Sequence, residues 1–140
     1  MPRHAGPSAC TAVLCTNFLL YNRGMDLSNF EKEFRPWGNF ERFTLNEKST
    51  VKLITVNPGE AFSLQTHVRR EEFWHIISGS GTITIGNDKA AAYPGEHFAI
   101  AAGVAHRAEA GGETLVFLEI AFGEFDESDI IRLEDRYGRA

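Results

Sequence analysis

This 140-residue sequence contains no long apolar run, only two cysteines and no excess of basic charge. No stretch approaches the ~20 apolar residues of a membrane helix, so we expect no membrane partner and a cytoplasmic location. The two cysteines, Cys10 and Cys15, lie near the N-terminus without a CxxC spacing and frame no disulfide scaffold. The net charge of −5 opposes binding to nucleic acid, which requires clustered Lys and Arg.

The composition that remains is typical of one small folded domain, with 43% hydrophobic and 24% charged residues. Residues 1–24 differ from the rest, because a basic start leads into an apolar stretch around Val13 to Leu20. A signal peptide, an ordered helix and a gene start assigned too early are three interpretations of this segment. We expect residues 1–24 to be disordered or mis-assigned and without function, and residues 25–140 to form a single domain.

After Met25 the chain consists of short apolar runs separated by turn residues such as Asn57-Pro58-Gly59. The runs show period-two features and cover residues 51–56, 73–77, 82–85, 97–101 and 114–122. This pattern predicts an all-β sandwich or barrel. The last stretch, Asp126 to Tyr137, is expected to be a short helix, because Asp126 or Ser128 can cap its start and a weak apolar face follows.

Three polar side chains have a spacing that indicates a metal site. Residues two apart in a strand point to the same face, so Gln65 and His67 project into one space. Glu72 begins the next apolar strand, and pairing of the two strands would bring it beside His67. Imidazole, carboxylate and amide oxygen suit one divalent ion, with zinc expected first and cobalt, manganese, iron or nickel as alternatives. A fourth ligand must come from elsewhere.

The same residues match two known motifs. The first motif is matched by Gly59, Gln65-Thr66-His67, Glu72 and Gly79, with glutamine in the place of its first histidine. The second is matched by Gly95, Ala101-Ala102-Gly103 and His106. The chain therefore resembles the cupin superfamily, whose fold is a double-stranded β-helix, or jelly-roll barrel. This resemblance makes His106 the fourth ligand and implies a metal held by Gln65, His67, Glu72 and His106.

Residues 34–139 resemble, more specifically, the type II mannose-6-phosphate isomerase, which occurs alone or as the C-terminal part of mannose-1-phosphate guanylyltransferases. Arg35-Pro36-Trp37-Gly38 is similar to its opening motif, and residues 130–139 are similar to its ending. The resemblance implies an aldose–ketose isomerase that interconverts mannose 6-phosphate and fructose 6-phosphate. It also favours three arginines as binders of the sugar phosphate: Arg70, Arg107 and Arg136.

Such an isomerisation needs a general base. Lys52 and Glu119 are the candidates, because each is a charged residue between apolar neighbours on an expected strand. His75 should face away from the metal, since Glu72 sets the inward positions of its strand. We expect His75 and His97 to be structural.

Two other functions stay open at this point. A non-catalytic cupin that binds a sugar or small anion is suggested by the shortened set of histidines around His67. A different cupin enzyme, such as an iron dioxygenase, would need only two histidines and a carboxylate as ligands. Whatever the function, we expect a homodimer, because cupin barrels have an exposed sheet edge and an apolar outer face that a symmetric copy can cover.

Overall fold

The computed structural model describes residue 27 and residues 29–140, and every ordered element in this part of the chain is a strand. The predictions made for residues 1–24 lie outside the described residues. The strands are β1 (Glu31–Arg35), β2 (Gly38–Arg42), β3 (Ser49–Val56), β4 (Leu64–Thr66), β5 (Glu72–Ser78), β6 (Gly81–Ile85), β7 (Asp88–Ala92), β8 (His97–Ile100), β9 (His106–Ala110), β10 (Leu115–Phe122) and β11 (Ile131–Glu134).

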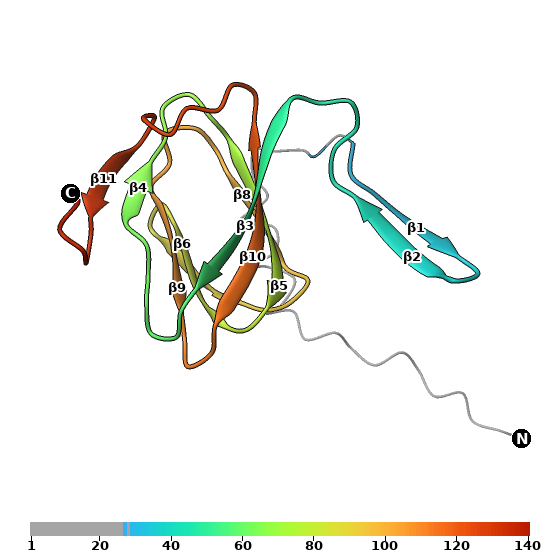
Figure 1. Ribbon diagram of the computed structural model, residues 1–140, viewed down its shortest axis with the longest axis horizontal. Coiled ribbons are helices and arrows are strands. Elements are labelled where there is room, and N and C mark those ends of the chain that lie inside the picture. The colour runs from blue at the N-terminus through green and yellow to red at the C-terminus, as the bar shows by residue number, and fades with distance from the viewer. Residues whose placement is uncertain (1–26, 28) are drawn as a thin grey trace, which may run out of the picture.

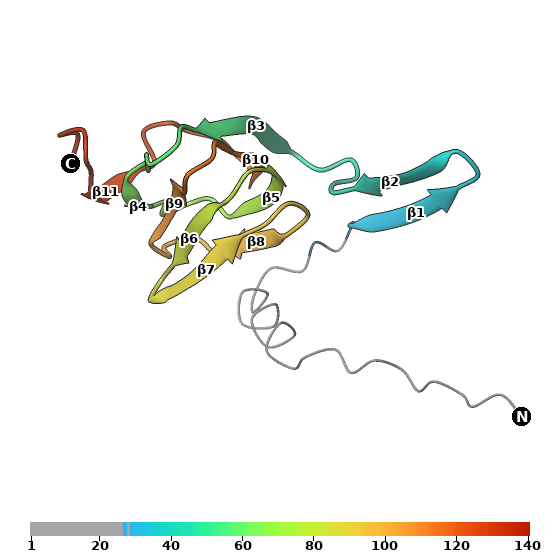
Figure 2. The ribbon, with the colours of Figure 1, turned by 90° about the horizontal axis from the view of Figure 1, so that it is seen from below.

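Two antiparallel sheets face each other and enclose a barrel, while a separate hairpin stands beside them (Figure 1). One sheet has the order β3-β10-β5-β8, and the other has the order β11-β4-β9-β6-β7. Consecutive strands pass back and forth between the sheets, which is the arrangement of a jelly roll. The all-β prediction is therefore confirmed. The hairpin β1–β2 projects away from the barrel in both views (Figures 1 and 2).

Strand alternation divides the apolar residues between the interior of the barrel and its outer surface. On β10, Leu115 and Phe117 belong to the main core, together with Trp74 and Ile76 of β5. Ile120, on the opposite face of β10, belongs to a second apolar cluster outside the barrel. Glu119 has the same parity as Leu115 and Phe117, so this carboxylate is carried into the barrel.

The predicted helix over Asp126 to Tyr137 is wrong, because this segment forms turns and the strand β11. Asp126 does accept a hydrogen bond from the Ser128 backbone N–H, but the bond closes an isolated turn instead of starting a helix. Ile131 and Arg132 then pair with β4. This strand supplies the backbone hydrogen-bond partners that would lie within the same segment in a helix. Within residue 27 and residues 29–140, no helix is long or apolar enough to cross a membrane.

Gly79 shows why one motif position has to be glycine. Its φ is +84°, and a Cβ built there would lie 1.8 Å from the backbone oxygen of Thr114. No side chain fits at this distance, so Gly79 allows the turn after β5 to pass directly beside the chain that enters β10.

Candidate metal centre

His67, Glu72 and His106 meet inside the barrel, and all three side chains are buried. Their candidate ligand atoms lie within 4.8 Å of one another. Glu72 and His106 begin β5 and β9, whereas His67 follows β4 directly. The backbone pairing of Gln65 with His106 fixes β4 against β9, and so brings the two imidazoles from distant parts of the chain together.

Backbone carbonyls fix the tautomer of both histidines. His67 donates from Nδ1 to the Asp129 carbonyl at 2.6 Å, and His106 donates from Nδ1 to the Val104 carbonyl at 2.9 Å. In a neutral imidazole the second nitrogen, Nε2, then carries a lone pair. The His67 and His106 Nε2 atoms lie 3.2 and 3.6 Å from the two Glu72 carboxylate oxygens. This carbonyl-to-imidazole arrangement is the one that orients histidines on metal ions.

The residues present fit a divalent cation. His106 Nε2 is buried and has no hydrogen-bond partner in the structure, although a buried acceptor of this kind normally has one. Burial also lowers the pKa of His106, so the ring stays neutral and able to bind a metal. Two neutral imidazoles and one carboxylate are a donor set that zinc and other first-row divalent ions accept.

Gln65, the fourth predicted ligand, lies beside the other three. Its Nε2 is 3.4 Å from His67 Nε2, and its Oε1 accepts a hydrogen bond from the Ser63 hydroxyl at 2.8 Å. A half-turn of the amide would face its oxygen toward the site. The Ser63 hydroxyl could then accept from the amide NH₂ instead, because a hydroxyl both donates and accepts.

Arg70 is only 5% exposed and contacts two of the candidate metal ligands inside the barrel. Its Nε donates to Glu72 Oε1 at 2.8 Å, and its Nη2 lies 3.2 Å from His67 Nε2. A third bond runs from Nη1 to the Asp126 carbonyl at 3.0 Å. The guanidinium therefore fixes the position of the Glu72 side chain, in addition to the phosphate-binding role that the family resemblance implied.

The two predicted catalytic residues lie close together in a cavity of about 180 Å³ that also borders Gln65 and Arg70. Lys52 and Glu119 are cross-strand partners on β3 and β10. Burial, the nearby charge of Glu72 and a hydrogen bond with that residue raise the pKa of Glu119 to about 7. Lys52 donates to Glu127 at the mouth of the cavity, at 2.8 Å. The arrangement thus provides a carboxyl group able to gain and lose a proton near neutral pH.

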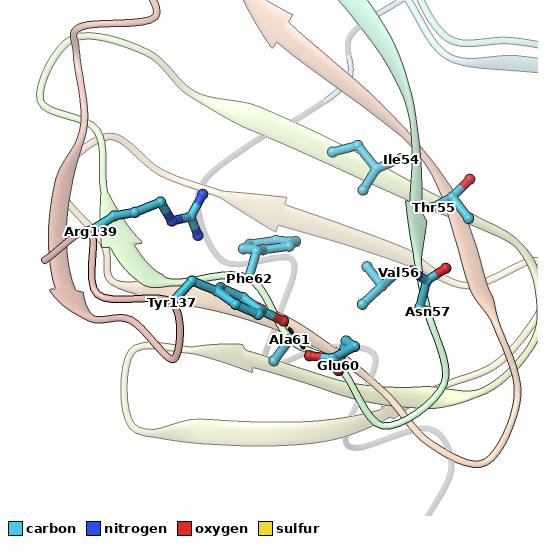
Figure 3. A pocket seen from close by; sticks show the side chains of 9 residues that line it. All are labelled: Ile54, Thr55, Val56, Asn57, Glu60, Ala61, Phe62, Tyr137 and Arg139. Carbon is cyan, nitrogen blue, oxygen red and sulfur yellow. Dashed lines mark hydrogen bonds between the residues drawn. The ribbon is translucent and has the colours of Figure 1, made fainter.

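A second, larger cavity of about 520 Å³ shares Ile54 and Phe62 with the first. Figure 3 shows it between β3 and the C-terminal residues Tyr137 and Arg139. The Tyr137 hydroxyl donates to Glu60, and Arg139 lies over the Tyr137 ring with its guanidinium paired to Asp135. The first cavity borders Gln65 and Arg70, which lie beside the histidine cluster, and the second borders Tyr137 and Arg139 near the end of the chain.

Neither Arg107 nor Arg136 lines these cavities. Arg107 donates to the Phe62 carbonyl at 3.0 Å and pairs with Glu134 at 3.3 Å. Arg136 donates to the Gly59 carbonyl and to Glu109, at 3.1 and 2.8 Å. The structure therefore does not bring these two predicted substrate ligands to the candidate site, and both tie neighbouring segments to one another.

Comparison with known proteins places this site in a family. Residues 22–135 match the family model described as "Mannose-6-phosphate isomerase C-terminal". The chain belongs to this family. The match includes all four candidate metal ligands together with Lys52 and Glu119, so the mannose-6-phosphate isomerase cupin resemblance found in the sequence is confirmed.

Curated relatives of this isomerase-type cupin are much longer proteins. The mannose-1-phosphate guanylyltransferase ManC of Salmonella typhimurium is 37% identical over 108 residues, which are 76% of this chain and 22% of ManC. The xanthan biosynthesis protein XanB of Xanthomonas campestris is 37% identical over 110 residues, which are 77% of this chain and 24% of XanB. The chain thus spans about a quarter of the length of these relatives.

Solved structures of low sequence identity share the fold. A cupin-2 domain protein of Rhodospirillum rubrum matches with a TM-score of 0.54 at 21% identity, over 72% of this chain and 77% of that one. The capsular polysaccharide assembling protein CapF of Staphylococcus aureus matches with a TM-score of 0.54 at 21% identity, over 75% of this chain and 32% of CapF. The isomerase-type domain is therefore a cupin barrel.

Sequence reasoning missed the part that Asp129 plays in the cupin site. Its carboxylate accepts hydrogen bonds from the Val68 and Arg69 backbone N–H groups at 2.9 and 3.0 Å, and its carbonyl orients His67. Those bonds lower the pKa of the Asp129 carboxyl. No signal in the local sequence connects Asp129 with His67, because the two residues are joined only by the tertiary fold.

Proposed function

We propose that this cupin is a metal-dependent aldose–ketose isomerase that interconverts mannose 6-phosphate and fructose 6-phosphate. The observation that carries the proposal is the position of Glu119, a buried carboxyl group paired across strands with Lys52 in a cavity that also borders Gln65 and Arg70. An acid–base group is most effective when its pKa is near the working pH, and this isomerisation consists of moving a proton between adjacent carbons. Membership of the isomerase family supports the same reaction.

His67, Glu72 and His106 would hold the metal ion, with Gln65 completing the set. We propose zinc, because two imidazoles and a carboxylate with a fourth neutral ligand suit this ion well. When bound, a divalent ion supplies a positive charge that polarises the carbonyl and hydroxyl oxygens of the sugar.

Glu119 is our proposed general base. In its ionised form it would accept the proton from the carbon next to the sugar carbonyl and return it to the former carbonyl carbon, while the hydroxyl proton passes from the oxygen on the first carbon to the former carbonyl oxygen, so that the carboxylate ends as it began. The charges of Lys52 and Arg70 act in the opposite direction to burial and lower the pKa of Glu119. In this proposal Glu119, not Lys52, is the base. Lys52 would keep part of the Glu119 population ionised and would attract the anionic substrate.

The substrate would lie along the two neighbouring cavities, which share Ile54 and Phe62. Its reacting end would face Glu119, its middle would pass Ile54 and Phe62, and its phosphate would reach Arg139. A guanidinium group matches phosphate oxygens, and Arg139 lines the far cavity, whereas Arg107 and Arg136 do not.

A coupled assay on zinc-loaded protein tests this function. Mannose 6-phosphate should give fructose 6-phosphate, whereas unphosphorylated mannose should turn over poorly because it lacks the group that Arg139 would bind. If protein of full metal content converts no sugar phosphate, the isomerase proposal is wrong. Calorimetric binding of the same sugar phosphates would in that case favour the non-catalytic sugar-binding alternative.

A further inference from the structure

Two cationic side chains that line the cavity of about 180 Å³ contact one aromatic ring. Lys52 Nζ lies 4.3 Å from the centroid of the Phe125 ring, and the guanidinium carbon of Arg70 lies 4.5 Å from the same centroid. A cation over the face of a ring at such a distance is attracted by the negative charge of that face. Phe125 has no part in the metal site or in the proposed proton transfer, so its contact with both cations needs another explanation.

Ion pairing alone fixes the position of Lys52 poorly. Its only ion pair within the described residues is with Glu127, whose side chain is 75% exposed. An ion pair that is open to water stabilises little, and it costs rotamer freedom in two long side chains. The ring of Phe125, which is half-buried, gives the ammonium group a second contact. Phe125 therefore limits the positions that the Lys52 ammonium group can take.

Arg70 can contact the same ring without losing its hydrogen bonds. Its Nε donates to Glu72 and its Nη1 donates to the Asp126 carbonyl. The N–H groups of a guanidinium lie in its plane, so hydrogen bonds leave its two faces available to an aromatic ring. The contact with Phe125 thus adds to the bonds that hold Arg70 against Glu72.

The backbone around Phe125 is anchored on both sides. The Gly123 N–H donates to the Lys48 carbonyl at 3.0 Å, and the Asp126 carbonyl accepts from Arg70 at 3.0 Å. Phe125 borders a different cavity, of about 400 Å³, and within the described part of the chain it does not line the cavity of about 180 Å³. The ring can therefore act on a substrate only through the two cations.

We propose that Phe125 is a positioning residue, whose ring holds the charged ends of Lys52 and Arg70 beside the reacting groups. Lys52 is the cross-strand partner of Glu119, the proposed base. Arg70 donates to Glu72, a candidate metal ligand. One ring thus fixes a neighbour of each of these two carboxylates. The inference rests on the proposed isomerase function and assigns Phe125 no contact with the substrate.

The alternative role for Phe125 is packing alone. A leucine at this position would fill much of the same space but would offer no negative ring face, whereas a tyrosine would keep both the volume and the ring. Packing predicts that stability follows side-chain volume and that turnover does not depend on the ring. Positioning predicts that turnover follows the presence of the ring.

Steady-state kinetics on metal-loaded protein with mannose 6-phosphate separates the two roles. Phe125→Leu should lower kcat/KM by about tenfold, because two cation–π contacts are lost, whereas Phe125→Tyr should stay within about threefold of wild type. Phe122→Leu is the matched control. Phe122 borders the same cavity of about 400 Å³, and no cation lies over its ring within the described residues. This control should keep wild-type turnover even where it lowers thermal stability.

A double-mutant cycle tests the contact without any substrate. Lys52→Met removes the charge and keeps the length of the side chain, so its coupling to Phe125→Leu in chemical unfolding isolates the contact between ring and ammonium group. We expect a coupling of about threefold in the unfolding equilibrium constant. An additive cycle would overturn the inference.

The kinetics give two further results that would overturn it: wild-type turnover in Phe125→Leu, or equal losses in Phe125→Leu and Phe125→Tyr. Failure of the proposed function would look different, because a wild-type protein of full metal content would then convert no sugar phosphate. In that case the cycle would still decide whether the Phe125 ring positions Lys52.

Discussion

His67 and His106 present Nε2 to Glu72 because backbone carbonyls hold the other nitrogen of each ring. His106→Ala should therefore reduce bound metal to a small fraction of the wild-type content while the barrel stays folded, since the core consists of apolar strands. His75→Ala is the control, because this histidine lies on the outer face and should leave metal content unchanged. Elemental analysis and thermal melts of both proteins provide the measurement. Wild-type metal content in His106→Ala would remove this residue from the site.

The second residue-scale prediction concerns Glu119. Glu119→Gln keeps the shape of the side chain but removes its proton exchange, so kcat should fall by about 10²–10⁴ with metal content unchanged. Glu127→Gln makes the same chemical change at an exposed carboxylate of the same cavity, and should change kcat by less than about tenfold. Equal losses in the two variants would show that Glu119 has no special part in proton transfer.

At the scale of single elements, the alternation of side chains along a strand explains part of what could be predicted from the sequence. Alternation correctly placed Gln65 and His67 on one side of the chain, whereas Glu119 was recognised as a charged residue between apolar neighbours on an expected strand. Alternation could not predict the end of the chain, because pairing with β4 overrode a helix-like pattern around Ile131. It also could not predict the bond from Arg70 to the Asp126 carbonyl, because these two residues are 56 positions apart and only the fold brings them together.

The contact between β5, β8 and the segment that precedes β3 predicts a pH-dependent stability. The rings of His75 and His97 are tilted against each other with 4.7 Å between their centroids, and both contact Phe43. His75 Nδ1 and His97 Nε2 are buried without hydrogen-bond partners. Burial is the main cause that lowers the pKa of both rings below 6.5, while Glu41 opposes it and Lys32 adds to it at His97.

The sign follows from proton uptake. Unfolded imidazoles take up protons near their ordinary pKa of 6.5, whereas the folded pair does so only at lower pH. The folded state therefore binds fewer protons below pH 6.5, and its stability should fall as the pH decreases through that range. Urea unfolding between about pH 7.5 and about pH 5.5 measures this loss, and the double variant His75→Phe with His97→Phe should reduce it. Equal losses in both proteins would exclude the pair as the cause.

At the scale of the whole molecule, the sequence motifs predicted the barrel and the group of candidate metal ligands, but they did not predict the exposed surfaces. Motif positions such as Gly79 and His106 are constrained by contacts within the barrel, so their types and spacing carry the fold. Phe34 and Trp37 are residue types that usually lie in a core, and only the structure shows that they face solvent.

The domain boundary gives the last prediction. All strands of the barrel lie after residue 48, and the outer cluster reaches back to Leu27, so a chain that starts at Met25 should fold, bind metal and melt like the full chain. A chain that starts at Glu31 keeps every strand but loses Leu27 and Phe30, together with the Asn29 carbonyl that accepts a hydrogen bond from Arg42. Its free energy of unfolding should be lower by about 2 kcal/mol, since two partly buried apolar side chains are removed from the outer face. Chemical denaturation of the three chains measures the difference. A shorter chain from Glu31 as stable as the full one would show that the outer cluster contributes little, and an insoluble chain from Met25 would move the boundary into residues 1–24.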